Sequence, residues 1–258
     1  MRNVLSIGRR EIMSFFVSPI AYFVITGFTL LAGYFFFNLL GIFNVILARY
    51  NSMPAMYRGD ANPNLNQWVI EGYYQTLVVI LVFLIPLLTM RIIAEEKKRG
   101  TFELLVTSPV SVTEIVFGKF LGVAFVILLM MLAVFMFPLL LCVYGNPEFM
   151  PILSGIFGLT ICALSFASIG MAVSSFTENQ IVAGISAMVT LLLLYVIHSP
   201  AESLEGGMKE VLLSLSPVMQ IRDMFSGVIA LKSLAYFFCL TAFGLFLSQR
   251  ALESYRWR

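Results

Sequence analysis

Six long stretches of the chain carry no charged side chain, and polar segments separate them. They contain 37, 19, 28, 29, 23 and 17 residues, bounded by Glu11 and Arg49, Glu71 and Arg91, Lys119 and Glu148, Glu148 and Glu178, Glu178 and Glu202, and Lys232 and Arg250. Ionisable groups are costly in hydrocarbon and a spanning helix needs about 20 apolar residues, so each stretch holds one span. The pattern predicts a single all-α transmembrane domain over residues 1–258, with six spans at about 19–43, 74–90, 116–144, 152–174, 181–197 and 233–247.

Composition excludes a soluble globular fold. Of the 258 residues, 60% are apolar and 12% are charged, whereas soluble domains carry about 25% charged residues. Cys142, Cys162 and Cys239 fall inside apolar stretches without metal-ligand or redox spacing, which indicates packing residues rather than a disulfide framework.

The basic residues predict an orientation. Eleven of the 16 Lys and Arg fall on the side that holds both termini and residues 91–115, and five fall on the other side. Positive residues concentrate in cytoplasmic loops, so we expect both termini and the 91–115 loop in the cytoplasm.

Shorter amphipathic segments flank the predicted spans. Residues 1–17 combine apolar and Arg positions in a pattern typical of an interfacial helix, and Ser18-Pro19 can cap and begin the first span. The outer loop, residues 49–73, is expected to be irregular or to contain only a short helix. Residues 198–232 hold two apolar clusters too short to span, which favours two re-entrant or interfacial helices on the outer side.

The segment 91–115 concentrates charge between the second and third predicted spans. Gly100 can break the incoming helix, Thr101 can cap a new helix of about two turns, and Pro109 can end it. Ser111 and Glu114 have the spacing of a capping box for the helix that leads into the third span. Two interpretations stay open: a helix that transmits a push from a cytoplasmic partner, or a solvated anchor loop.

Absent motifs narrow the function further. The sequence has no phosphate-binding loop, since Gly118-Lys119 lacks both the upstream Gly and the following Ser or Thr, so we do not expect the chain to bind ATP. No predicted span shows a buried acid or base, which argues against ion coupling. His198 has no Cys or carboxylate at ligand spacing. We therefore expect no enzyme activity, no metal, no cofactor and no nucleic-acid partner.

Several motifs together resemble one known family. Residues 95–105 (EEKKRGTFELL), Ser108-Pro109 and Gly118-Lys119-Phe120 are similar to the coupling-helix signature of ABC-2-type exporter permeases. Residues 174–182 (SSFTENQIV) and 224–229 (MFSGVI) resemble the branch that includes gliding-motility-type permeases.

The resemblance implies a permease subunit of the bacterial cytoplasmic (inner) membrane. It would pair with a second permease, identical or paralogous, and with two cytoplasmic ABC ATPase subunits that bind the ATP.

The resemblance also implies which residues contact the ATPase. The main contact comprises Glu95, Gly100, Thr101, Phe102, Glu103, Leu105 and Pro109, and a smaller one comprises the turn from Thr177 to Gln180. Thr177 and Gln180 also fit a capping box for the fifth span. By the same analogy Gln75, Thr76, Ser186 and Thr190 line the translocation cleft, although hydroxyls in spans more often bond their own backbone.

Two alternatives belong to other classes. The chain could be a membrane anchor or force-transmitting scaffold that docks an ATPase and carries nothing. An intramembrane enzyme acting on lipids is the weakest interpretation, because clustered acids, bases and metal ligands are missing from the sequence.

Overall fold

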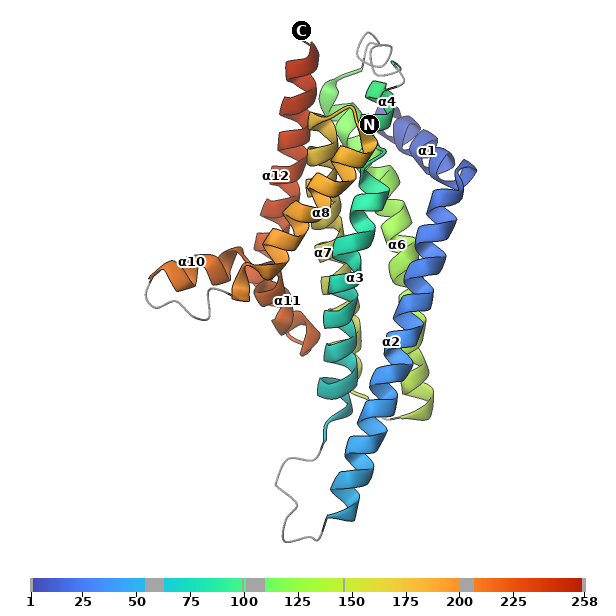
Figure 1. The fold of residues 1–258 in the computed structure, drawn as a ribbon, viewed down its shortest axis with the longest axis vertical. Coiled ribbons are helices and arrows are strands. Elements are labelled where there is room, and N and C mark those ends of the chain that lie inside the picture. The colour runs from blue at the N-terminus through green and yellow to red at the C-terminus, as the bar shows by residue number, and fades with distance from the viewer. Residues whose placement is uncertain are drawn as a thin grey trace.

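The structure is a bundle of long helices (Figure 1). It is a computed structural model that describes residues 2–53, 63–98, 100, 110–145, 147–199 and 207–256, and these residues contain helices and no strand. The helices are α1 (Arg2–Val17), α2 (Pro19–Ser52), η2 (Asn66–Glu71, a π-helix), α3 (Gly72–Thr89), α4 (Ala94–Lys98), α6 (Val112–Tyr144), α7 (Phe149–Phe176), α8 (Gln180–Val196), α10 (Gly207–Leu215), α11 (Pro217–Phe225) and α12 (Leu231–Arg256).

Five helical segments of the described chain are long and apolar enough to cross a membrane. They are Pro19–Ser52, Asn66–Lys98, Val112–Val143, Phe149–Phe176 and Leu231–Ser254. The expected span at 181–197 forms α8, which has 17 residues and is shorter than these five. A multi-pass helical membrane protein is thus confirmed, with five spans by length and one shorter apolar helix.

The helix that holds the first predicted span is longer than that span. The α2 helix continues past Phe43 to Ser52, because the sequence between them contains neither proline nor glycine and one Arg does not end a helix. Residues 66–71 are also helical, as η2. The expected loop at 49–73 is therefore helical at both of its described ends.

The α7 helix is the centre of the bundle. It packs against α3, α6, α8, α11 and α12, and most of its residues are buried. A Cβ atom at Gly155 would overlap the Tyr74 ring of α3, and one at Gly158 would lie 2.8 Å from the Met224 sulfur of α11. Small residues let helix backbones approach closely in lipid, where no hydrophobic effect drives helices together.

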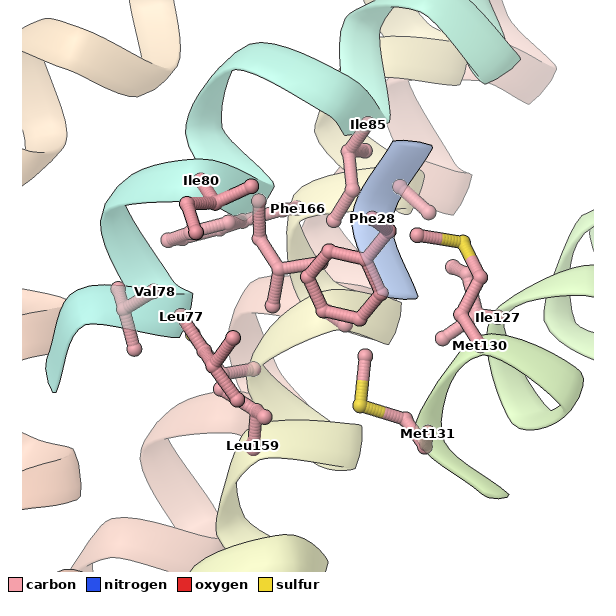
Figure 2. Packing of buried hydrophobic residues seen from close by; sticks show 14 of the residues in the cluster. Phe28, Leu77, Val78, Ile80, Ile85, Ile127, Met130, Met131, Leu159 and Phe166 are labelled. Atoms are coloured by element: carbon pink, nitrogen blue, oxygen red, sulfur yellow. The ribbon is translucent and has the colours of Figure 1, made fainter. Parts of the chain in front are cut away.

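Large apolar side chains fill the space between the helices. Figure 2 shows Phe28 of α2 beside Ile85 of α3 and close to Met130 and Met131 of α6. Each of these side chains is buried. Methionine fills irregular gaps between rings and branched side chains, so α2, α3 and α6 form one continuous core with α7.

Two helix starts follow the predicted local chemistry. The Ser18 side chain accepts a hydrogen bond from the Ile20 amide, and Pro19 occupies the first turn of α2. The Ser111–Glu114 capping box at the start of α6 is present with both of its reciprocal hydrogen bonds. Caps depend on neighbours in sequence, which is why they could be predicted.

Both ends of the chain lie at one end of the bundle, where α4 also lies (Figure 1). The α8 helix starts at this end, and α10 and α11 join it to α12, which returns there (Figure 1). The α11 helix buries Ile221, Met224 and Phe225, whereas α10 buries no residue and projects sideways from the bundle. Residues 198–232 thus contain two short helices in their described part, and a re-entrant or interfacial position for them stays a prediction.

The contact between α3 and α7 gives a stability prediction. We expect Gly155→Ala to lower the free energy of unfolding by about 1–3 kcal/mol, because the added methyl overlaps the Tyr74 ring and forces it to move. Thermal unfolding of the purified protein in detergent, followed by circular dichroism, measures the effect.

Gly41→Ala is the matched control, since nothing lies within 4 Å of a Cβ atom at Gly41. It should leave the midpoint unchanged or raise it slightly, because Ala has the higher helix propensity. Equal effects of the two substitutions would contradict the close packing of α3 on α7.

Candidate functional site

Lys119 of α6 lies where three helices meet, at the α4 end of the bundle. Its side chain is fully buried, with 0% exposed. The Nζ atom lies 2.8 Å from Glu11 Oε1 of α1 and 2.8 Å from Glu96 Oε2 of α4, and it donates a 2.9 Å hydrogen bond to the Ile92 carbonyl. One ammonium group thus joins α1, α4 and α6.

Two glycines let α1 come close enough for this pairing. A Cβ atom at Gly118 would lie 2.7 Å from the Cβ of Ile7, and one at Gly122 would lie 2.6 Å from the Cβ of Glu11. Real Cβ atoms essentially never approach so closely. Glycine at these two positions, four residues apart and therefore on one face of α6, creates the groove in which α1 lies.

Two arginines complete the cluster. Arg10 of α1 lies 2.8 Å from Glu96 Oε1. Arg91 donates to Glu95 Oε2 at 2.9 Å and to the Ser18 hydroxyl at 2.8 Å, which ties the end of α3 to the junction of α1 and α2. We call the set Arg10, Glu11, Arg91, Glu95, Glu96 and Lys119 the charge cluster, and the end of the bundle that holds it the charged end. Its three cations and three carboxylates balance.

The α4 helix is also anchored to α7. Ser174 Oγ accepts from the Ala94 amide at 3.2 Å and donates to the Met90 carbonyl at 3.1 Å. Lys97 Nζ donates to the Ser175 carbonyl at 2.6 Å. The five residues of α4 are therefore fixed against α1, α6 and α7 at once.

Two of the residues that the sequence assigns to the main ATPase contact are described. Glu95 belongs to the charge cluster. Gly100 has a φ of +70° and its amide donates to the Lys97 carbonyl at 3.1 Å, so it ends the incoming helix as expected. Thr101, Phe102, Glu103, Leu105 and Pro109 lie outside the described residues.

The predicted capping box of Thr177 and Gln180 is wrong. Asn179 is the N-cap of α8, and its side-chain oxygen accepts from the amides of Ile181 and Val182. Thr177 instead follows the last residue of α7, and its hydroxyl accepts from the Asn179 amide. Asn is a stronger N-cap than Thr, and the α7–α8 turn is short enough for it to take that role. Both residues still lie on this turn, near the Lys97 anchor at Ser175.

The four predicted cleft residues do not converge on one site. Gln75 lines a cavity of about 290 Å³ with residues of α8 and α11. The hydroxyls of Thr76 and Thr190 bond backbone carbonyls of their own helices at 2.8 Å, and Ser186 is exposed on α8. Hydroxyls within spans more often bond a backbone carbonyl of their own helix, as Thr76 and Thr190 do here. A role of the four residues in lining a cleft stays a prediction.

The described residues provide no evident metal site. Among them, no group of three or more His, Cys, Asp and Glu side chains comes together. His198 Nδ1 lies 2.7 Å from the Tyr195 carbonyl, an interaction within its own turn.

The charge cluster was missed in the sequence. The expectation that no span contains a buried acid or base is wrong, because Lys119 lies within the predicted third span and is fully buried. One feature of the sequence could have indicated the cluster: Gly118 and Gly122 are four residues apart and flank Lys119. Two glycines at this spacing let another helix pack closely on α6, next to the charged lysine. Its partners, Glu11 and Glu96, are far away in sequence, so only the tertiary packing reveals them.

Together, the spans and the charged end define a class: a multi-pass helical membrane protein with a polar assembly at one end. The model of the ABC-2 family of transporter proteins matches residues 40–249, which is most of the chain, and the chain therefore belongs to this family. No curated protein matches it. Members of the family are membrane permeases of ABC transporters without a nucleotide-binding domain, and they normally work with cytoplasmic ATPase subunits.

The charge cluster gives a second prediction. We expect Lys119→Met to lower the free energy of unfolding by about 3 kcal/mol, because it removes the fully buried cation that Glu11 and the half-buried Glu96 share and leaves them paired with the more exposed Arg10. The double variant Lys119→Met/Glu11→Gln should recover part of the loss. Chemical unfolding in detergent measures both.

Arg250→Met is the control, since its ion pair with Glu253 at 3.0 Å is exposed to solvent. It should not shift the unfolding midpoint measurably. A Lys119→Met protein as stable as the Arg250→Met protein would show that the cluster does not hold the three helices together.

Proposed function

We propose that the chain is the permease subunit of an ATP-driven ABC-2-type exporter. In this proposal it forms the translocation path as a dimer with an identical or paralogous permease in the bacterial inner membrane. Two separate cytoplasmic ATPase subunits bind the ATP and drive it, and the chain itself has no cofactor and catalyses no reaction. The resemblance of residues 174–182 and 224–229 adds that the complex serves a gliding-motility or other envelope-associated system.

The observation that carries the proposal is the anchoring of α4. This helix leads directly through Gly100 into residues 101–109, the segment that resembles a coupling helix. Glu96 of α4 pairs with Arg10 of α1 and with Lys119 of α6. Lys97 of α4 donates a hydrogen bond to the Ser175 carbonyl of α7. A force applied to residues 101–109 would therefore reach three helices through short polar contacts, which is what coupling to an ATPase requires.

The turn between α7 and α8 is the proposed second contact. It lies beside α4, because Lys97 is bonded to Ser175 at the end of α7. Thr177 and Gln180 are thus close enough to α4 for one ATPase subunit to contact both regions.

The orientation and the sixth crossing belong to the same proposal. Five crossings would place the two termini on opposite sides of the membrane, but both chain ends lie at the charged end (Figure 1). At about 1.5 Å per residue, α8 is about 25 Å long, close to the roughly 30 Å of a hydrocarbon core. We therefore assign α8 as the sixth span, α10 and α11 as re-entrant or interfacial helices on the outer side, and the charged end to the cytoplasm.

The coupling role gives a third prediction. We expect Phe102→Ala and Glu103→Ala each to reduce the stimulation of the partner ATPase by about tenfold, because each removes one anchor of an interface dominated by few residues. Membrane insertion and expression should stay normal. ATP hydrolysis by the complex reconstituted in vesicles measures the effect.

Glu210→Ala is the control, because α10 lies far from the charged end and is exposed. Its ATPase stimulation should equal that of the wild type. Normal co-purification and normal hydrolysis in both the Phe102→Ala and Glu103→Ala proteins would refute the coupling role.

A non-transporting anchor or force-transmitting scaffold is the second candidate, favoured by the lengths of α2 and α6. With 34 and 33 residues, these helices extend about 50 Å, so about 20 Å of each lies beyond a hydrocarbon core. Such ends could hold a partner outside the membrane. Movement of an amphiphilic cargo across reconstituted vesicles, dependent on ATP, supports the exporter, and ATP hydrolysis without any cargo movement supports the scaffold.

A further inference from the structure

A cavity of about 740 Å³ lies in the angle between α1 and the segment from Arg91 to Glu96. Its wall combines ionic side chains, among them Arg10, Arg91 and Glu95, with apolar ones such as Met13 and Val17. Ligand sites in proteins occupy about 300–1,000 Å³, so the cavity is large enough for a lipid headgroup and its glycerol.

The position of the cavity points to an amphiphile. Ser18 lines it and also caps α2, a membrane span that begins at Pro19. The cavity therefore lies at the depth where the chain enters hydrocarbon. Val17 is 87% exposed and Met13 is 52% exposed, and both border the cavity, so its opening offers apolar contacts to a lipid chain.

The charges select the kind of headgroup. Among the described residues, two guanidinium groups and three carboxylates line the cavity, and Lys119 behind its wall balances the excess carboxylate of this set. A ligand with both a phosphate and an ammonium group keeps this balance, whereas a purely anionic headgroup places one extra negative charge beside the carboxylates. Glu95 and Glu96 present carboxylate oxygens, which are hydrogen-bond acceptors that suit an ammonium group.

We propose that this cavity binds a membrane phospholipid with a zwitterionic headgroup that ends in a primary ammonium. Its phosphate lies against Arg10 and Arg91, and its ammonium donates hydrogen bonds to Glu95 and Glu96. A trimethylated ammonium has no N–H to donate, so choline headgroups bind more weakly. The bound lipid joins α1 to the segment leading into α4. The site depends on the chain being a membrane protein and not on the proposed coupling to an ATPase.

Native mass spectrometry of the full chain tests the site. The protein is released from detergent after incubation with equal amounts of phosphatidylethanolamine, phosphatidylcholine and phosphatidylglycerol of identical acyl chains. We expect about fivefold more retained phosphatidylethanolamine than phosphatidylcholine, the difference of about one net hydrogen bond, and the least phosphatidylglycerol.

Two variants localise the preference. Ser14 is exposed and lines the cavity, so Ser14→Trp fills the space and should abolish selective retention. Leu5→Trp, at a 68% exposed position of the same helix outside the cavity, should retain the wild-type preference. Glu95→Gln can still accept the Arg91 hydrogen bond but lacks the charge, so it should bring the ethanolamine-to-choline ratio close to one without abolishing lipid binding.

Three results would overturn the proposal. The first is equal retention of ethanolamine and choline lipids by the wild type. The second is a preference that persists unchanged in Ser14→Trp and in Glu95→Gln. The third is strongest retention of phosphatidylglycerol, or displacement of all lipid by free phosphoethanolamine, because these would indicate an anionic-lipid site or a site for a soluble ligand.

Discussion

The arrangement of the charged end depends on one buried ammonium group. A buried charge is costly unless it is paired and hydrogen-bonded, so Lys119 requires anions and acceptors around it. Glu11 and Glu96 provide them from α1 and α4, two helices that the Arg10–Glu96 ion pair also joins. The position of α1 and of α4 against α6 follows from this requirement.

The constraint works only because small residues allow close approach. Gly118 and Gly122 bring α1 onto α6, as Gly155 and Gly158 bring α3 and α11 onto α7. The bundle therefore has an apolar part held by packing and a polar end held by ion pairs. The cavity between α1 and Arg91 borders the polar end and opens where the first span begins.

The sequence predicts those features that depend on local chemistry. The uncharged stretches predict the positions of the spans, two serines predict the caps of α2 and α6, and Gly100 predicts the end of α4. Each of these features depends on residues that are close together in the sequence. The sequence does not predict the partners of Lys119, which lie 108 and 23 positions away in the chain, nor the competition in which Asn179 caps α8 in place of Thr177. The sequence analysis does not predict that α2 continues as a helix to Ser52, beyond the predicted span. Of the proposed contact residues, the structure describes Glu95, Gly100, Thr177 and Gln180 and places them all at the charged end.

The central claim is that the charged end faces the cytoplasm and presents residues 101–109 to an ATPase. The most direct measurement is labelling by a membrane-impermeant thiol reagent in a variant whose three native cysteines are replaced by alanine. A cysteine at position 101 should react only after the inner membrane is opened, whereas a cysteine at position 148, at the other end of the bundle, should react in sealed cells. Reaction of the position 101 cysteine in sealed cells would contradict the orientation and the coupling role built on it.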